Sequence, residues 1–104
     1  MNLPKVVSDL IETQNSFDSV AYADCFSETA VVYDEGKTHK GRKEIENWIE
    51  KANKEYQATM KPLEYSEERQ ELKSEISGSF PGSPIVLTFH YEYQNGLIQS
   101  LKIV

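Results

Sequence analysis

Three helical patterns and several strand patterns follow one another along the chain. Near the N-terminus, apolar residues recur three or four positions apart, which predicts an amphipathic helix with one buried face. These residues are Leu3, Val7, Leu10 and Ile11. Asp18 can accept a hydrogen bond from the free N–H groups of the residues after it, which favours a second, short helix there. The chain is therefore expected to open with a helical hairpin.

A longer helix is predicted in the middle of the chain, after two short strands. The β-branched and aromatic run 30–34, the turn signal Glu35-Gly36 and the segment 38–40 predict a strand pair. After Gly41, apolar residues again fall on one helical face as far as Tyr56. Those residues are Ile45, Trp48, Ile49, Ala52 and Tyr56. This central helix is the strongest helical pattern in the sequence.

The C-terminal half predicts strands only, at 58–65, 72–77, 85–93 and 97–104. Asn95-Gly96 is a typical two-residue hairpin turn, and the Gly- and Pro-rich segment 78–84 is a loop. In the strand 85–93, one side carries Ile85, Leu87, Phe89, Tyr91 and Tyr93. We expect that side to face helices or a cavity, and His90 on the other side to face a partner or solvent. Helices followed by an antiparallel meander indicate an α+β fold with the helices on one face of a curved sheet.

Composition narrows the classes of protein to consider. The 104 residues contain 17 acidic and 11 basic side chains, so the net charge is −6 and nucleic acid is not an expected partner. No apolar run approaches the roughly 20 residues of a membrane-spanning helix, and no signal-peptide core follows Met1, so we expect a cytoplasmic protein without a membrane partner. Cys25 has no second Cys for a disulfide and no metal-ligand spacing, and we expect it in the core. The length fits one domain, 1–104.

Three short motifs together resemble one superfamily. They are FSETAVVYD at 26–34, GRKEI at 41–45 with Trp48, and Asn95-Gly96 before the last strand. This combination resembles the nuclear transport factor 2-like superfamily and, within it, the SnoaL-like group of polyketide cyclase and ketosteroid isomerase type. The resemblance implies a cone-shaped curved sheet packed on the N-terminal helices and the long central helix, a pocket between them, and a homodimer formed through the sheet.

The ketosteroid isomerase mechanism can be compared residue by residue. Asp34 is similar in position to the general base of that enzyme, which lies at the end of the first strand. The isomerase also stabilises its enolate with a Tyr and a protonated Asp, a pair that serves as a standard worked example of pKa tuning. In this chain Leu10 and Phe89 occupy those two positions. The loss of one such donor typically costs about 10²- to 10³-fold in rate, so steroid isomerisation by that mechanism is not expected.

Two residues are candidates for acid–base chemistry. Asp34 at a strand end would be partly desolvated and thus a stronger base, although Asp before Glu-Gly is equally typical of a hairpin turn. His39 could lie across the hairpin from Asp34 as a cross-strand pair, or it could be a solvated loop residue.

Other residues are candidates for contact with a ligand. The expected lining residues are Val32, Trp48, Phe89, Tyr91 and Tyr93. Trp48 could equally be a core residue, although its indole N–H needs a partner. Tyr91 or Tyr93 could supply the hydrogen-bond donor that Leu10 and Phe89 cannot. No metal site and no cofactor motif are expected.

Three functions fit these patterns. The first is a pocket protein for a small apolar molecule, which could act as a cofactor-free isomerase, cyclase or dehydratase with Asp34 as general base. The second is a binder with the same pocket and no catalysis. The third is a dimeric association module that uses the sheet face, with a cavity filled by its own side chains.

Overall fold

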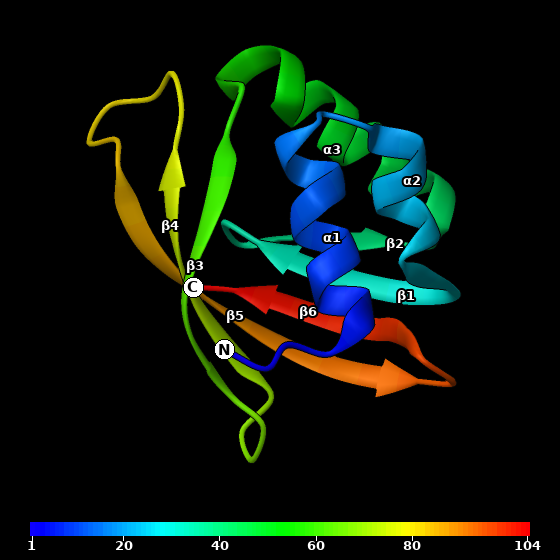
Figure 1. Cartoon of the computed structure of the whole chain (residues 1–104). Coiled ribbons are helices and arrows are strands. Elements are labelled where there is room, and N and C mark those ends of the chain that lie inside the picture. The colour runs from blue at the N-terminus through cyan, green and yellow to red at the C-terminus, as the bar shows by residue number, and fades with distance from the viewer.

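A computed structural model describes all 104 residues as three helices that cover one face of a curved six-stranded sheet (Figure 1). The helices are α1 (Lys5–Asn15), α2 (Ser19–Asp24) and α3 (Arg42–Tyr56). The strands are β1 (Phe26–Asp34), β2 (Lys37–Lys40), β3 (Thr59–Ser66), β4 (Glu71–Ser77), β5 (Ile85–Gln94) and β6 (Leu97–Ile103). The predicted α+β class and the cone-like arrangement of sheet and helices are confirmed. β1 begins at Phe26, four residues earlier than the predicted strand.

Local sequence explains where the elements begin and end. The side chain of Asp18 accepts a hydrogen bond from the backbone N–H of Ala21 at 3.0 Å, which caps α2 as predicted. α3 begins after Gly41, whose φ of 87° suits glycine and whose N–H donates to the backbone oxygen of Ala30 at 2.8 Å. The same bond ties the start of the central helix to β1. The Asn95-Gly96 turn joins β5 to β6, as the sequence predicts.

The sheet is mixed, although an antiparallel sheet was predicted. The strand order is β2-β1-β6-β5-β4-β3, and every neighbouring pair is antiparallel except β1 with β6. The meander from β3 to β6 fixes the direction of β6, and that direction happens to match β1 where the two strands meet. β1 and β6, the first and last strands along the chain, thus lie side by side in the sheet, a pairing that joins distant parts of the chain (Figure 1).

The strand register places residues in rows across the concave face. One row runs from His39 through Val32 and Leu101 to Tyr91, because each of these is the direct partner of the next. The neighbouring row starts at Asp34 and continues through Ile103, Phe89 and Leu72. Directly paired residues in a sheet point to the same face, so both rows point toward the helices.

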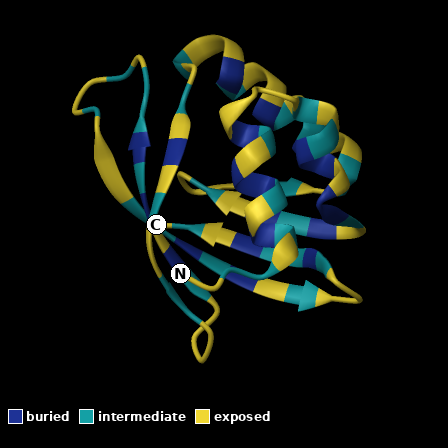
Figure 2. Ribbon diagram, in the orientation of Figure 1, coloured by how far each residue is buried: buried dark blue, intermediate teal, exposed yellow.

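One hydrophobic cluster of 17 buried residues lies between the helices and the sheet, and the exposed residues lie outside it (Figure 2). A buried amide pair joins the helices, because Gln14 Nε2 donates to Asn53 Oδ1 at 3.1 Å and to the backbone oxygen of Ala58 at 2.7 Å. Buried polar groups need such partners, so this pair fixes α1 against α3 and the start of β3. None of the helices has the length and apolar character needed to cross a membrane.

Candidate functional site

The carboxylate of Asp34 lies at the inner end of β1. Asp34 shares its face of the strand with Ala30 and Val32, which are both fully buried, and it is itself half-buried. Burial raises the pKa of Asp34, the nearby charge of Glu35 raises it further, and His39 partly opposes both effects. A carboxylate with a raised pKa is a stronger base than one exposed to water, so this environment suits Asp34 to accept a proton.

His39 lies beside Asp34 but not directly opposite it. The direct partner of Asp34 is Lys37, whereas His39 pairs with Val32, so of the two alternatives for His39 the direct cross-strand pair with Asp34 is wrong. His39 is not a loop residue either, because it lies on β2. The hairpin register places His39 two positions further along, which makes it a diagonal neighbour on the same face. Its ring stacks on the indole of Trp48, with a centroid distance of 5.0 Å and an interplanar angle of 25°. Trp48 is half-buried, between the core and the surface.

An aromatic wall on β5 faces the helices across from Asp34. Phe89 is 4% exposed and Tyr91 is 2% exposed, and the ring of Tyr91 stacks on that of Tyr93 at 5.8 Å. The hydroxyl of Tyr93 is hydrogen-bonded to the hydroxyl of Tyr65 at 2.9 Å. The side of β5 that the sequence predicts to face the interior does so at Phe89 and Tyr91. Ile85, at the start of the strand, is exposed.

Two tyrosine hydroxyls lie inside the fold. The hydroxyl of Tyr91 is buried and has no hydrogen-bond partner. Burial is the main cause that raises the pKa of both Tyr22 and Tyr91, and the charge of Asp34 adds to the effect on Tyr22. Both phenols therefore remain protonated at neutral pH and can act as hydrogen-bond donors.

Solved structures share this arrangement over the full chain. The chain is similar to a putative polyketide cyclase from Sinorhizobium meliloti, with 33% sequence identity and a TM-score of 0.91. That similarity covers 98% of this chain and 95% of the other. The chain belongs to the nuclear transport factor 2-like superfamily, in its SnoaL-like group.

Two more distant structures share the fold of this chain. An NTF2-like protein of unknown function from Cytophaga hutchinsonii has 17% identity and a TM-score of 0.77, covering 100% of this chain and 90% of that one. A hypothetical protein with a ketosteroid isomerase-like fold from Catenulispora acidiphila, in complex with trimethylamine, has 16% identity and a TM-score of 0.79. The latter similarity covers 99% of this chain and 86% of that one. No protein-family model matches the chain, and no curated protein does.

The two residues that the resemblance aligns with the hydrogen-bond donors of the isomerase are core residues of this SnoaL-like chain. Leu10 is fully buried on α1 and Phe89 is 4% exposed on β5, so both pack in the core. The phenols inside the fold come from other positions. Tyr22 enters from α2, and Tyr65 reaches the site because a register shift between Pro62 and Glu64 brings it opposite the buried Leu72. Tyr65 was not among the predicted site residues, and Pro62 was the only sequence signal for the irregularity that places it.

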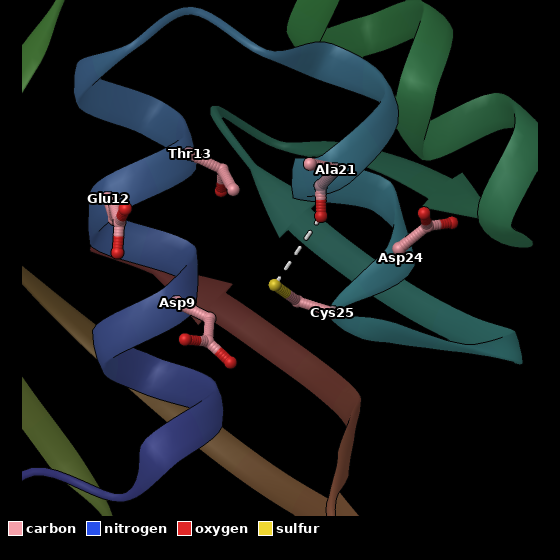
Figure 3. A pocket seen from close by; sticks show the side chains of 6 residues that line it. All are labelled: Asp9, Glu12, Thr13, Ala21, Asp24 and Cys25. Carbon is pink, nitrogen blue, oxygen red and sulfur yellow. Dashed lines mark hydrogen bonds between the residues drawn. The ribbon is translucent and has the colours of Figure 1, made fainter.

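Two hollows in the surface of this SnoaL-like fold lie away from Asp34. One, of about 340 Å³, lies between α1 and α2 (Figure 3). Its lining residues are Asp9, Glu12, Thr13, Ala21, Asp24 and Cys25. A second, of about 640 Å³, lies over the N-terminal turn of α3 and the adjoining strand ends. Neither contains any of the predicted ligand-binding residues, and no cluster of three His, Cys, Asp or Glu side chains could hold a metal ion.

Cys25 lies at the inner edge of the hollow between α1 and α2, where its Sγ donates to the backbone oxygen of Ala21 at 3.6 Å (Figure 3). Burial, followed by the charges of Asp9 and Asp24, raises the pKa of the Cys25 thiol to about 11. The thiolate is the nucleophile, and its fraction at pH 8 falls from about one-quarter for an ordinary thiol to about 0.1%. We expect native protein to react with iodoacetamide at least about 100-fold more slowly than protein unfolded in urea, measured by mass spectrometry. Equal rates would show that the thiol is not protected.

Proposed function

We propose that this protein binds a small, largely apolar carbonyl compound between its helices and its sheet and removes a proton from it with Asp34. One observation carries the proposal, namely a half-buried carboxylate of raised pKa on the same face as an apolar and aromatic interior. Val32 and Phe89 supply apolar contacts from the sheet, and the stacked rings of Trp48 and His39 supply a flat surface at its side. A protein of the same fold was solved with a small organic amine, trimethylamine, which supports small-molecule binding by this architecture.

The chemistry that Asp34 can perform is proton transfer next to a carbonyl. A carboxylate oxygen of Asp34 takes the proton from the α-carbon, and the C–H electron pair forms the carbon–carbon double bond of an enolate. In a ketone with a β,γ double bond, return of the proton from Asp34 to the γ-carbon gives isomerisation. In a β-hydroxy ketone, the hydroxyl group takes the proton from Asp34 and leaves the β-carbon as water, which gives dehydration. Attack of the enolate carbon on a second carbonyl gives cyclisation. Each outcome needs one base and no redox step.

A second candidate is a binder without catalysis, and one specific observation favours it. Leu10 and Phe89 leave the two donor positions of the isomerase without a polar group. A binder would keep the same interior, and Asp34 would then contribute to affinity alone. Binding and proton exchange measured on the same compound separate the two functions.

Association of two copies through the outer face of the sheet is part of the proposal. Val86 on the outer side of β5 is 56% exposed, so this end of the strand offers apolar surface to a second copy. On the same strand His90 Nδ1 lies 2.8 Å from Glu71 Oε2. This contact holds the imidazole on the outer face of the sheet and gives one of its ring nitrogens a partner there. His90 therefore has no part in the proposed chemistry.

The test is a thermal-shift screen of ketones, polyketide-like aromatics and steroids against wild type and Asp34→Asn. A ligand that binds only the folded state raises Tm, by an amount that grows with its concentration relative to Kd. We expect at least one ketone to stabilise the wild type. Glu92→Gln, which removes an exposed carboxylate from β5, is the matched control and should respond as wild type does. If no compound class raises Tm, binding of a small carbonyl compound is wrong, and the sheet-face association module takes its place.

A further inference from the structure

β3 forms one edge of the sheet, and the end of α1 closes part of that edge. Asn15, the last residue of α1, bonds the backbone of Met60 at two points. Its Nδ2 donates to the oxygen of Met60 at 3.0 Å, and its Oδ1 accepts from the N–H of Met60 at 2.7 Å, so the two segments lie side by side (Figure 1). An amide side chain has the same donor and acceptor as a peptide group. Asn15 therefore does for Met60 what one residue of a neighbouring strand would do.

The backbone of β3 is closed at a second position by proline. Alternate residues of an edge strand point their backbone groups away from the sheet, so Pro62 follows Met60 in facing the free edge. Pro62 has no N–H to donate to another strand. An open edge can pair with a strand of another molecule, and proline at such an edge weakens that pairing. Of the two protections, only the contact of Asn15 can be released.

The charges of β3 suit pairing with a second copy of itself. An antiparallel alignment centred on the segment Met60–Tyr65 places Lys61 of each copy opposite Glu64 of the other. Within one chain, Lys61 already pairs with Glu75 on β4, and Glu64 pairs with Lys73. Charges would then alternate in sign along a row of four strands, and directly opposed charges of opposite sign stabilise a sheet.

The same alignment continues the apolar inner face of the sheet. Within one chain, Met60 pairs with Ile76 and Tyr65 pairs with Leu72. Met60, Ile76 and Leu72 are buried. Met60 of one copy would lie opposite Tyr65 of the other, which joins the two inner rows. This pairing needs the backbone groups of Met60 that Asn15 holds, so a second copy can join only after Asn15 releases them.

We propose that the free edge of β3 is a self-pairing surface whose partner is β3 of a second copy, and that Asn15 keeps this edge closed. The inference does not depend on the proposed ligand, and it concerns a different surface from the outer face of the sheet. Removal of the Asn15 side chain should let two copies join their six-stranded sheets edge to edge.

Hydrogen exchange tests whether Asn15 closes the edge. A net hydrogen bond is worth about a factor of ten, so the N–H of Met60 should exchange about tenfold faster in Asn15→Ala than in wild type. The rates are measured by NMR in dilute protein, before copies associate. Ser16→Ala is the matched control, because Ser16 Oγ donates to backbone oxygens of α1 and does not reach β3. Met60 should exchange in that variant as it does in wild type.

Sedimentation equilibrium tests the pairing itself. With rising concentration, the mass of Asn15→Ala should approach twice that of wild type. Adding Glu64→Lys should return the mass to the wild-type value, because Lys61 would then face a like charge, and adding Lys61→Glu as well should restore association. Glu64→Lys with Asn15 intact should leave the mass of wild type unchanged. This last control separates the edge from the outer face of the sheet, on which Glu64 lies.

Each result bears on one step of the proposal. Unchanged exchange at Met60 in Asn15→Ala overturns the role of Asn15. Fast exchange with a wild-type mass shows an open edge that does not pair, which overturns the self-pairing surface, and association that persists with Glu64→Lys overturns the alignment. Failure to bind small molecules overturns the proposed function and leaves these results unaffected. Circular dichroism checks the fold of each variant, and Asn15→Ser, whose side chain is too short to reach both groups of Met60, takes the place of Asn15→Ala if that variant does not fold.

Discussion

Replacing Asp34 by Asn should slow the exchange of the α-protons of 2-tetralone with D₂O by about 10²- to 10⁴-fold, the range that a general base contributes. The amide of Asn keeps the shape of the side chain but cannot accept a proton in this way. The rate is followed by proton NMR of 2-tetralone, after subtraction of the rate in buffer alone. This readout needs no knowledge of the natural substrate, because enolisation is the first step of every reaction proposed above.

The pH dependence of the same rate reports the pKa of Asp34. The base works when it is ionised, so exchange by wild type should rise with pH through a pKa above the usual value of an aspartate. Stability should change in the opposite direction. Because the folded-state pKa is raised above the unfolded-state value, the folded protein holds the proton more tightly, and this contribution to stability is present below the unfolded-state pKa. This contribution is lost as the pH rises from the unfolded-state pKa to the folded-state pKa of Asp34. Asp34→Asn lacks the titrating group, so its stability relative to wild type should increase from acid to neutral pH.

Glu92→Gln serves as the control, since it makes the same change of charge on an exposed residue of β5. Its exchange rate and its stability profile should follow those of wild type. If Asp34→Asn exchanges α-protons as fast as wild type although both bind 2-tetralone, Asp34 is not the base and the protein is a binder. If stability of wild type and Asp34→Asn changes with pH in parallel, the carboxylate is not desolvated.

Local patterns in the sequence were sufficient to predict most of the helices and strands. Helix periodicity gave α1 and α3, the side chain of Asp18 gave the start of α2, and Asn95-Gly96 gave the last hairpin. These features depend on residues within a few positions of one another. The placement of Asp34 on the inner face follows from the same kind of reasoning, because its parity with the buried Val32 can be read from the chain.

Features that depend on distant parts of the chain could not be predicted in this way. The parallel pairing of β1 with β6 follows from where the meander ends, which no local signal specifies. The pairing of His39 with Val32 depends on the register of one hairpin, and a shift of two residues separates it from the predicted pairing with Asp34. The hydrogen bond of Tyr65 to Tyr93 spans 28 residues and requires an irregular strand. The contribution of Tyr65 to the site could therefore be identified only in the folded structure, whereas Tyr91 and Tyr93 were predicted from the alternation along their strand.

Gly78 is another residue whose role depends on a distant part of the chain. Its replacement by Ala should give the largest loss of stability among single changes at glycine. Sequence patterns assign it to a turn-rich loop, whereas the structure places it against the end of α3. A Cβ atom at this position would lie 2.6 Å from the backbone oxygen of Tyr56 and 3.1 Å from the Cα of Ala58. The next residue, Ser79, donates its N–H to the same oxygen of Tyr56 at 2.7 Å, so the two segments cannot separate without loss of that bond.

We expect Gly78→Ala to lower the free energy of unfolding by about 2–4 kcal/mol, from overpacking together with the weakened hydrogen bond. Gly96→Ala is the matched control, because Gly96 has a φ of 77° and a Cβ added there would meet no atom within 4 Å, so only backbone strain of about 1 kcal/mol opposes the change. Urea unfolding of both variants gives the comparison. A cost for Gly78→Ala no greater than that for Gly96→Ala would mean that the end of α3 and the end of β4 can move apart freely. In that case the contact would not hold the central helix, and with it Trp48, in place over the sheet.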